Sequence, residues 1–248
     1  IMTIDPYLAE FIGTFFLLLL GAGVVANVNL KNTIAEGQTP WVLITTAWGF
    51  AVFVGVFITG QFSGAHLNPA VTIGLAVANK FSFILVPGYL IAQFLGAMAG
   101  SWLCYLIYID HYRLTEEEGL VRSTFCTHPV IRNFKNNFLS EFVGTFVLVF
   151  GVLFIAVPNI EIEGMEVKNF GLGALEALPV AILVWVIGMG LGGTTGYAIN
   201  PARDFGPRLV YQLLPRKNKD ADWSYAWIPV LGPFAGGTFA GLLYTLFV

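Results

Sequence analysis

The chain contains the segment Gly64-Ala65-His66-Leu67-Asn68-Pro69-Ala70, and 132 residues later Gly196-Tyr197-Ala198-Ile199-Asn200-Pro201-Ala202 repeats its pattern. A second pair of matching segments, built around Glu10 and Glu141, lies 131 residues apart. Two separate matches with almost the same offset indicate one internal duplication. We therefore predict a single domain over residues 1–248, made of two homologous halves at about residues 1–110 and 138–248.

Apolar residues dominate both halves and gather in long blocks. They make up 56% of the chain against 11% charged residues, and the mean hydropathy is +0.76. A soluble domain needs more surface charge, so a soluble protein with buried core helices is the weaker alternative. A helix of about 20 apolar residues crosses a bilayer core. Six blocks predict an all-α membrane protein, namely residues 6–26, 41–62, 81–109, 142–160, 177–202 and 224–248.

Composition also limits the function classes. The net charge is −3 and there is no basic cluster, so we expect no nucleic-acid partner. The two cysteines, Cys104 and Cys126, have neither metal-binding nor redox spacing, and we expect no metal and no cofactor. Because no paired acid and base and no nucleophile are recognisable, we expect no catalytic residues and no enzyme.

The duplication predicts where a functional site lies. Each half holds three predicted spans, and an odd number makes the second half enter the membrane from the opposite side. Such inverted repeats carry their site near the midplane, where the halves meet. Two further apolar pieces, residues 68–79 and 200–214, are too short to cross a bilayer. They are either half-helices that enter from opposite faces and meet at their N-termini, or interfacial loop segments.

The Asn-Pro-Ala triplets favour the half-helices. Asn is a preferred N-cap and Pro is preferred at the first helical position, so Asn68-Pro69 and Asn200-Pro201 are suitable helix starts. The side-chain oxygen of each Asn accepts from its own helix, and its NH₂ group remains free to donate. Two such donors at the midplane orient a passing oxygen and break a proton-conducting wire. The two positive helix ends oppose cations.

Two motifs resemble the pore loops of the aquaporins. They are Ser63 to Thr72, which includes Ala70, and Gly196 to Pro207, which includes Ala202. Over essentially its whole length the chain is more similar to the bacterial glycerol facilitators. The resemblance implies an aquaporin-like bundle of six transmembrane helices and two half-helices. It also implies a homotetramer with a pore in each protomer, in the cell membrane, with both termini in the cytoplasm. Loop charges taken alone favour the reverse orientation.

The resemblance also places the narrowest point of the pore. It maps this selectivity filter onto Trp48, Gly188, Tyr197 and Arg203. Water-selective relatives have His at the position of Gly188. The resemblance implies that Gly widens the ring of four filter residues and leaves Trp48 and Tyr197 as an apolar corner opposite the Arg203 donor. An Arg203 paired with Asp204 and a Trp48 used for packing are the alternatives.

The backbone before each half-helix is expected to line the pore with carbonyl acceptors. The residues concerned are Gly64, Ala65, His66, Leu67, Thr195, Gly196 and Ala198. A packed His66 is the alternative for that side chain. Glu10 and Glu141 are expected to support this irregular backbone as hydrogen-bond acceptors, because backbone groups in a membrane must be satisfied internally. Membrane carboxylates are otherwise candidates for proton relays.

Together these features predict a passive transmembrane channel for glycerol, water and other small uncharged solutes, which excludes protons and ions. The lipid bilayer is its other expected partner. Two alternatives stay open. One is a water-selective channel, which Gly188 and Asp204 argue against. The other is a proton-coupled secondary transporter that uses Glu10 and Glu141 as coupling sites.

Overall fold

The structure, a computed structural model, describes residues 3–38, 41–156, 172–217 and 219–248. Every regular element in these ranges is a helix. In chain order the α-helices are α1 (Pro6–Asn29), α2 (Trp41–Ser63), α3 (Pro69–Val77), α4 (Val86–Ile107), α5 (Ile109–Leu114), α6 (Glu118–Ser123), α7 (Phe134–Leu153), α8 (Leu178–Leu191), α9 (Pro201–Leu213) and α10 (Ile228–Tyr244). The short 3₁₀ helices η1 (Phe83–Leu85) and η2 (Gly173–Ala177) lead into α4 and α8.

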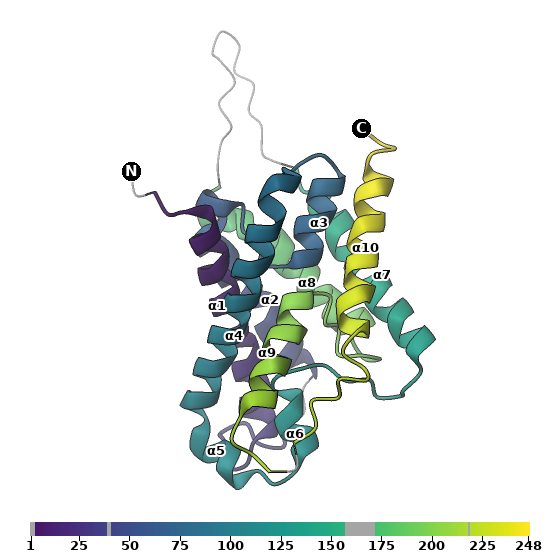
Figure 1. Cartoon of the computed structure of the whole chain (residues 1–248). Helices are drawn as coiled ribbons and strands as arrows, with labels where there is room; N and C mark the ends of the chain where they lie inside the picture. The colour runs from purple at the N-terminus through teal and green to yellow at the C-terminus, as the bar shows by residue number, and fades with distance from the viewer. Residues whose placement is uncertain (1–2, 39–40, 157–171, 218) are drawn as a thin grey trace.

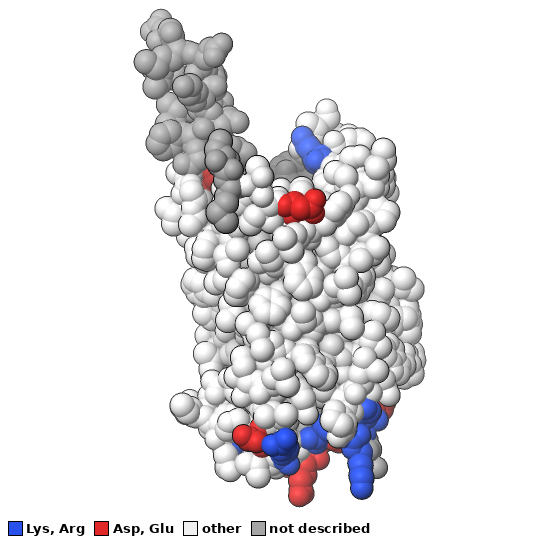
Figure 2. Space-filling model, turned by 60° about the vertical axis from the view of Figure 1, so that its left-hand side comes forward, with Lys and Arg blue, Asp and Glu red and all other residues white. Residues whose placement is uncertain are grey.

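The long helices have the dimensions of membrane spans. With η1 and η2 included, the helical stretches of α1, α2, α4, α7 and α8 each have 19 to 25 residues and are apolar enough to cross a bilayer. The sixth, α10, is apolar but has 17 residues, which at about 1.5 Å per residue is slightly shorter than a typical bilayer core. On the face shown in Figure 2, charged side chains lie toward the two ends and the middle is uncharged.

The two halves repeat the same packing. In the first half α1 packs against α2 and α4, and in the second half α7 packs against α8 and α10. The half-helix α3 follows α2 and contacts α10, whereas α9 follows α8 and contacts α4, so each half-helix packs against a long helix of the other half. Figure 1 shows α3 toward the end that holds both chain termini and α9 toward the opposite end. The predicted fold of six long helices and two half-helices is confirmed.

The fourth predicted span was placed too late in the chain. α7 begins at Phe134, eight residues before the block at 142–160, and Glu141 therefore lies inside the helix. Its N-cap is Asn133, whose side chain accepts from the backbone N–H of Asn136 at 3.1 Å. The prediction followed apolar residues alone, and a capped helix with a polar first turn extends beyond them.

The fifth predicted span was too long. α8 ends at Leu191, although the apolar block continues to residue 202. Residues 194–200 of that block form an irregular loop whose members are mostly buried, so their apolar character reflects burial rather than helix. Between the third and fourth predicted spans the chain forms the short helices α5 and α6. Residues 157–160 of the fourth block, and the residues from there to 171, lie outside the described residues.

Glycines at equivalent positions let helices of each half approach closely. A Cβ atom added to Gly96 of α4 would lie 2.3 Å from the carbonyl oxygen of Phe11 in α1. A Cβ on Gly236 of α10 would lie 2.2 Å from the carbonyl oxygen of Phe142 in α7. Small residues at such contacts are the usual solution for helix packing in membranes. The duplication therefore extends to the backbone contacts between helices.

We expect Gly236→Ala to destabilise the protein, because the obstacle is backbone that cannot move without separating α10 from α7. Overpacking of this kind costs about 1–3 kcal/mol, and thermal unfolding in detergent would measure it. Gly23→Ala in α1 is the matched control, since a Cβ there meets nothing within 4 Å. Equal unfolding temperatures for the two variants would contradict the packing role of Gly236.

Candidate functional site

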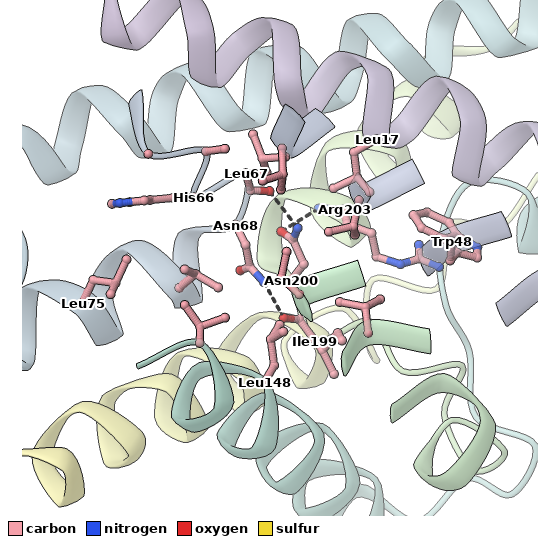
Figure 3. Close-up of a pocket in the computed structure, with 18 of the residues that line it drawn as sticks. Leu17, Trp48, His66, Leu67, Asn68, Leu75, Leu148, Ile199, Asn200 and Arg203 are labelled. Carbon is pink, nitrogen blue, oxygen red and sulfur yellow. Dashed lines mark hydrogen bonds between the residues drawn. The ribbon is translucent and has the colours of Figure 1, made fainter. Parts of the chain in front are cut away.

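A cavity of about 280 Å³ lies between the ends of the two half-helices and the surrounding long helices. Figure 3 shows His66 and Leu75 toward one end, the Asn68 and Asn200 pair in the middle, and Arg203 and Trp48 toward the other end. Its lining comes from both halves and is mostly apolar. The lining residues are Leu17, Trp48, Val52, Val56, Gly64, Ala65, His66, Leu67, Asn68, Val71, Leu75, Leu148, Val152, Ile155, Val180, Val184, Tyr197, Ala198, Ile199, Asn200 and Arg203.

Each Asn caps its half-helix as the sequence predicts. The side-chain oxygen of Asn68 accepts from the backbone N–H of Ala70 at 2.8 Å. The side-chain oxygen of Asn200 accepts from Ala202 at 3.0 Å and from Arg203 at 3.2 Å. Both Asn side chains are 95% buried, so the caps are protected from bulk water. The N-termini of α3 and α9 are thereby fixed at the middle of the cavity.

The amide groups of the two Asn side chains are not entirely free, which corrects the sequence prediction. Asn68 Nδ2 donates to the carbonyl oxygen of Ile199 at 2.8 Å, and Asn200 Nδ2 donates to that of Leu67 at 2.9 Å (Figure 3). An amide carries two N–H donors, so each Asn has a second N–H that no other described residue uses. The two crossed bonds connect the halves of the chain directly in the middle of the cavity.

The loops before the half-helices have the same unusual backbone. Gly64 and Gly196 have φ angles of +79° and +81°. Non-glycine residues after them also have positive φ angles. These are +47° for Ala65 and +53° for Leu67 in the first loop, and +38° for Tyr197 and +43° for Ile199 in the second. A non-glycine residue in this region costs about 1–3 kcal/mol, and for a β-branched residue such as isoleucine it is a clear outlier. Strong contacts must therefore hold both loops.

The two buried glutamates supply those contacts. Glu10 accepts from the backbone N–H groups of His66 and Leu67, each at 2.8 Å. Glu141 accepts from those of Ala198 at 3.0 Å and Ile199 at 2.8 Å. Both side chains are fully buried. Their carboxylates thus satisfy the backbone of the irregular loops, which is the arrangement that the sequence reasoning expected.

The surroundings of the two carboxylates differ. Glu10 also accepts from Ser63 Oγ and Gln93 Nε2, each at 2.7 Å. Glu141 accepts instead from Thr195 Oγ1 at 2.7 Å. The sequence reasoning did not assign Ser63 or Gln93 to the site. An amide side chain inside an otherwise apolar span was the available signal for Gln93, because such a group needs a buried partner.

Arg203 lies against an aromatic face, and no carboxylate of the described residues forms a salt bridge with it. Its guanidinium carbon is 4.2 Å from the centre of the Trp48 ring, a cation–π geometry. Asp204 instead bonds Arg208, with Nε to Oδ1 at 2.8 Å and both side chains fully buried. Asp204 also accepts from the backbone N–H of Thr127 at 2.7 Å. The alternative of an Arg203–Asp204 salt bridge is therefore wrong.

Three residues that were predicted to line the pore are absent from the described lining of the cavity. Gly188, Thr195 and Gly196 are not among the cavity-lining residues in the part of the chain that the structure describes. A Cβ on Gly188 would lie 2.7 Å from Cζ of Tyr197, so the tyrosine ring covers this glycine. Thr195 is occupied with Glu141. His66 does line the cavity and also packs against Phe81, with ring centres 4.6 Å apart, so both readings of this residue hold.

A membrane-spanning bundle with a central cavity between two half-helix ends has the architecture of a channel. The model of the major intrinsic protein family matches residues 2–244, and the chain belongs to this family. Members of the family are channels and not enzymes.

Similar proteins come from several bacteria and from a parasite. The chain is 48% identical to the probable glycerol uptake facilitator protein of Thermotoga maritima, over 96% of this chain and 97% of the relative. It is 46% identical to the glycerol uptake facilitator protein of Streptococcus pneumoniae strain R6, with the same two coverages. The X-ray structure of the aquaglyceroporin from Plasmodium falciparum matches with a TM-score of 0.80 and 30% identity, over 96% of this chain and 93% of that one.

We expect Glu141→Gln to destabilise the protein, because an amide offers one acceptor oxygen and turns its NH₂ group toward a backbone donor. A buried unsatisfied group of this kind costs about 1–3 kcal/mol, which thermal unfolding in detergent would report. Glu176→Gln is the control, because that exposed side chain accepts from the single backbone N–H of Leu172 at 2.9 Å. A Glu141→Gln protein as stable as the control would contradict the supporting role.

Proposed function

We propose that the chain forms a passive channel for glycerol, water and other small uncharged solutes, and that it excludes protons and ions. The observation that carries this proposal is the arrangement of the cavity. The capping amides of Asn68 and Asn200 lie in its middle, and Arg203 lies over the Trp48 indole toward one end. The glycerol facilitators and the aquaglyceroporin to which the chain is similar support the same solute class.

The arginine end of the cavity suits a small polyol. The Arg203 guanidinium has five N–H donors and no acceptor, so it offers hydrogen bonds to hydroxyl oxygens. Trp48 and Tyr197 line the same cavity with apolar ring surface, and both are at least 93% buried. A glycerol molecule has a carbon edge that fits the rings and hydroxyl groups that fit the guanidinium. We therefore assign the selectivity filter to Trp48, Tyr197 and Arg203, with Gly188 as the space behind Tyr197.

The middle of the cavity accounts for the exclusion of protons and cations. The remaining N–H donors of Asn68 and Asn200 turn a passing oxygen so that it accepts from both. A molecule held in this way cannot accept and pass on a proton at the same point. The N-termini of α3 and α9 also meet here, and their positive dipole ends repel cations.

The two alternatives are not favoured. A proton-coupled transporter needs carboxylates that reach the solute pathway. Within the described residues, neither Glu10 nor Glu141 lines the cavity, and both carboxylates are engaged with the pore loops. A strictly water-selective channel is not favoured because the relatives at 46% to 48% identity are glycerol facilitators.

We also propose a homotetramer in the cell membrane, with a pore in each protomer and both termini in the cytoplasm. The structure supports this orientation to the extent that both termini lie at the same end of the bundle (Figure 1). The long helices carry large exposed apolar side chains, such as Phe50, Leu95 and Ile182, which suit contact with lipid or another protomer. The resemblance to the aquaporins is the support for the assembly and for the cytoplasmic side of the termini.

Stopped-flow swelling of proteoliposomes tests the proposed function. We expect glycerol and water fluxes well above those of protein-free vesicles, a glycerol flux linear in its gradient, and no dependence on a pH gradient. A pH-sensitive dye inside the same vesicles should report no proton flux above background. Saturable uptake driven by a pH gradient would instead support the transporter, and a proton current would refute the midplane mechanism.

We expect Gly188→Ala to reduce glycerol flux several-fold and water flux much less. The new Cβ would lie 2.7 Å from the Tyr197 ring and push it into the cavity, where a polyol needs more width than water. Gly190→Ala is the matched control in the same helix, because a Cβ there meets nothing within 4 Å. Equal losses of the two fluxes would remove Gly188 from the control of pore width.

A further inference from the structure

The first residue of α2, Trp41, contacts the constriction from outside the cavity. Its indole N–H donates to the carbonyl oxygen of Gly188 at 3.0 Å. Its ring meets the Tyr197 ring edge-on, with centres 5.7 Å apart and an angle of 80° between the planes. Trp41 is not a lining residue in the described part of the chain, so any effect on solutes must pass through these two neighbours.

Gly188 of α8 and its C-cap residue Gly192 form a close-fitting support for the Tyr197 ring. A Cβ on Gly192 would lie 2.5 Å from Cδ1 of Tyr197 and 2.7 Å from Cζ2 of Trp41, and a Cβ on Gly188 would also overlap the tyrosine. The Gly188 carbonyl accepts from Trp41 and from the backbone N–H of Gly192 at 3.2 Å. Both lone pairs of this oxygen are therefore used, and the indole fixes the end of α8 that supports the ring.

Tyr197 depends on this packing for its position. Its backbone has a φ of +38°, an unfavourable value for a non-glycine residue. Its hydroxyl is buried and has no hydrogen-bond partner among the described residues. A ring without its own polar anchor is held by van der Waals contact, and Trp41, Gly188 and Gly192 provide that contact on the side away from the lumen.

We propose that Trp41 is a positioning residue that sets the width of the constriction, by fixing the Gly188 carbonyl and closing the space behind Tyr197. The inference rests on the proposed channel function and assigns part of its size selection to a residue outside the pore. Without the indole, Tyr197 relaxes away from Arg203 and the constriction admits larger polyols.

The test compares Trp41→Ala, which removes both contacts, with Trp41→Phe, which keeps a ring but loses the N–H donor. Trp102→Phe in α4 is the matched control, because Trp102 is 42% exposed against 38% for Trp41. Stopped-flow measurements on proteoliposomes give the permeabilities to water, glycerol and the four-carbon polyol erythritol. We expect Trp41→Ala to raise the erythritol-to-glycerol ratio at least about threefold, because size discrimination per added group is modest. Trp41→Phe should give a smaller rise and Trp102→Phe none.

A role in folding alone would lower all three permeabilities in parallel and leave their ratios unchanged, which would overturn the inference. If Trp41→Ala does not reconstitute, the erythritol-to-glycerol ratios of Trp41→Phe and Trp102→Phe are compared. A higher ratio for Trp41→Phe supports the inference, and equal ratios overturn it. An unmodified protein that carries no glycerol would refute the proposed function and the inference with it. An unmodified protein that conducts glycerol, with variants of unchanged selectivity, would refute the inference alone.

Discussion

Two turns of irregular backbone inside a membrane protein impose the constraint on which the rest of the structure depends. Lipid offers no hydrogen bonds, so each exposed N–H of these turns must find an acceptor within the protein. Glu10 and Glu141 provide carboxylates at equivalent positions of α1 and α7, and each accepts from two consecutive backbone N–H groups. The turns can therefore keep positive φ angles that would otherwise be unfavourable. The half-helices begin where they do because these turns are held.

The Asn pair converts this local support into a connection between the halves. The oxygen of Asn68 caps α3 while its nitrogen bonds the loop before α9, and Asn200 makes the reciprocal contacts. One side chain thus ends a turn, starts a helix and fixes the opposite loop. In the proposed channel the same amide has one donor left for the solute. Replacement of this side chain would affect structure and conduction together, and a change in flux at Asn68 would not by itself identify a contact with solute.

Much of this was readable from the sequence because the duplication places Glu10, Glu141 and the Asn-Pro-Ala triplets in matched positions. Helix bounds were less readable. Hydropathy does not separate a span from a buried loop, which is why α8 was predicted to run through residues 192–202. The Asn cross-links and the packing of Tyr197 over Gly188 depend on side chains brought together by folding. A glycine in the sequence indicates that a neighbour can approach closely, but only the packed structure shows that this neighbour is Tyr197 at Gly188.

The two halves differ at a few positions, and these differences explain how a duplicated structure can select solutes as well as conduct them. The frame of capping Asn residues and supporting glutamates is nearly the same in both halves, and in our proposal it governs proton and cation exclusion. The second half adds Arg203 and Tyr197 where the first has Val71 and Ala65. In our proposal the constriction therefore lies at one end of the cavity, beside Trp48, whereas His66 and the apolar Leu75 lie toward the other end (Figure 3). The solute selectivity can then change through the side chains of Trp48, Tyr197 and Arg203, because the loops before the half-helices are held by Glu10 and Glu141 instead.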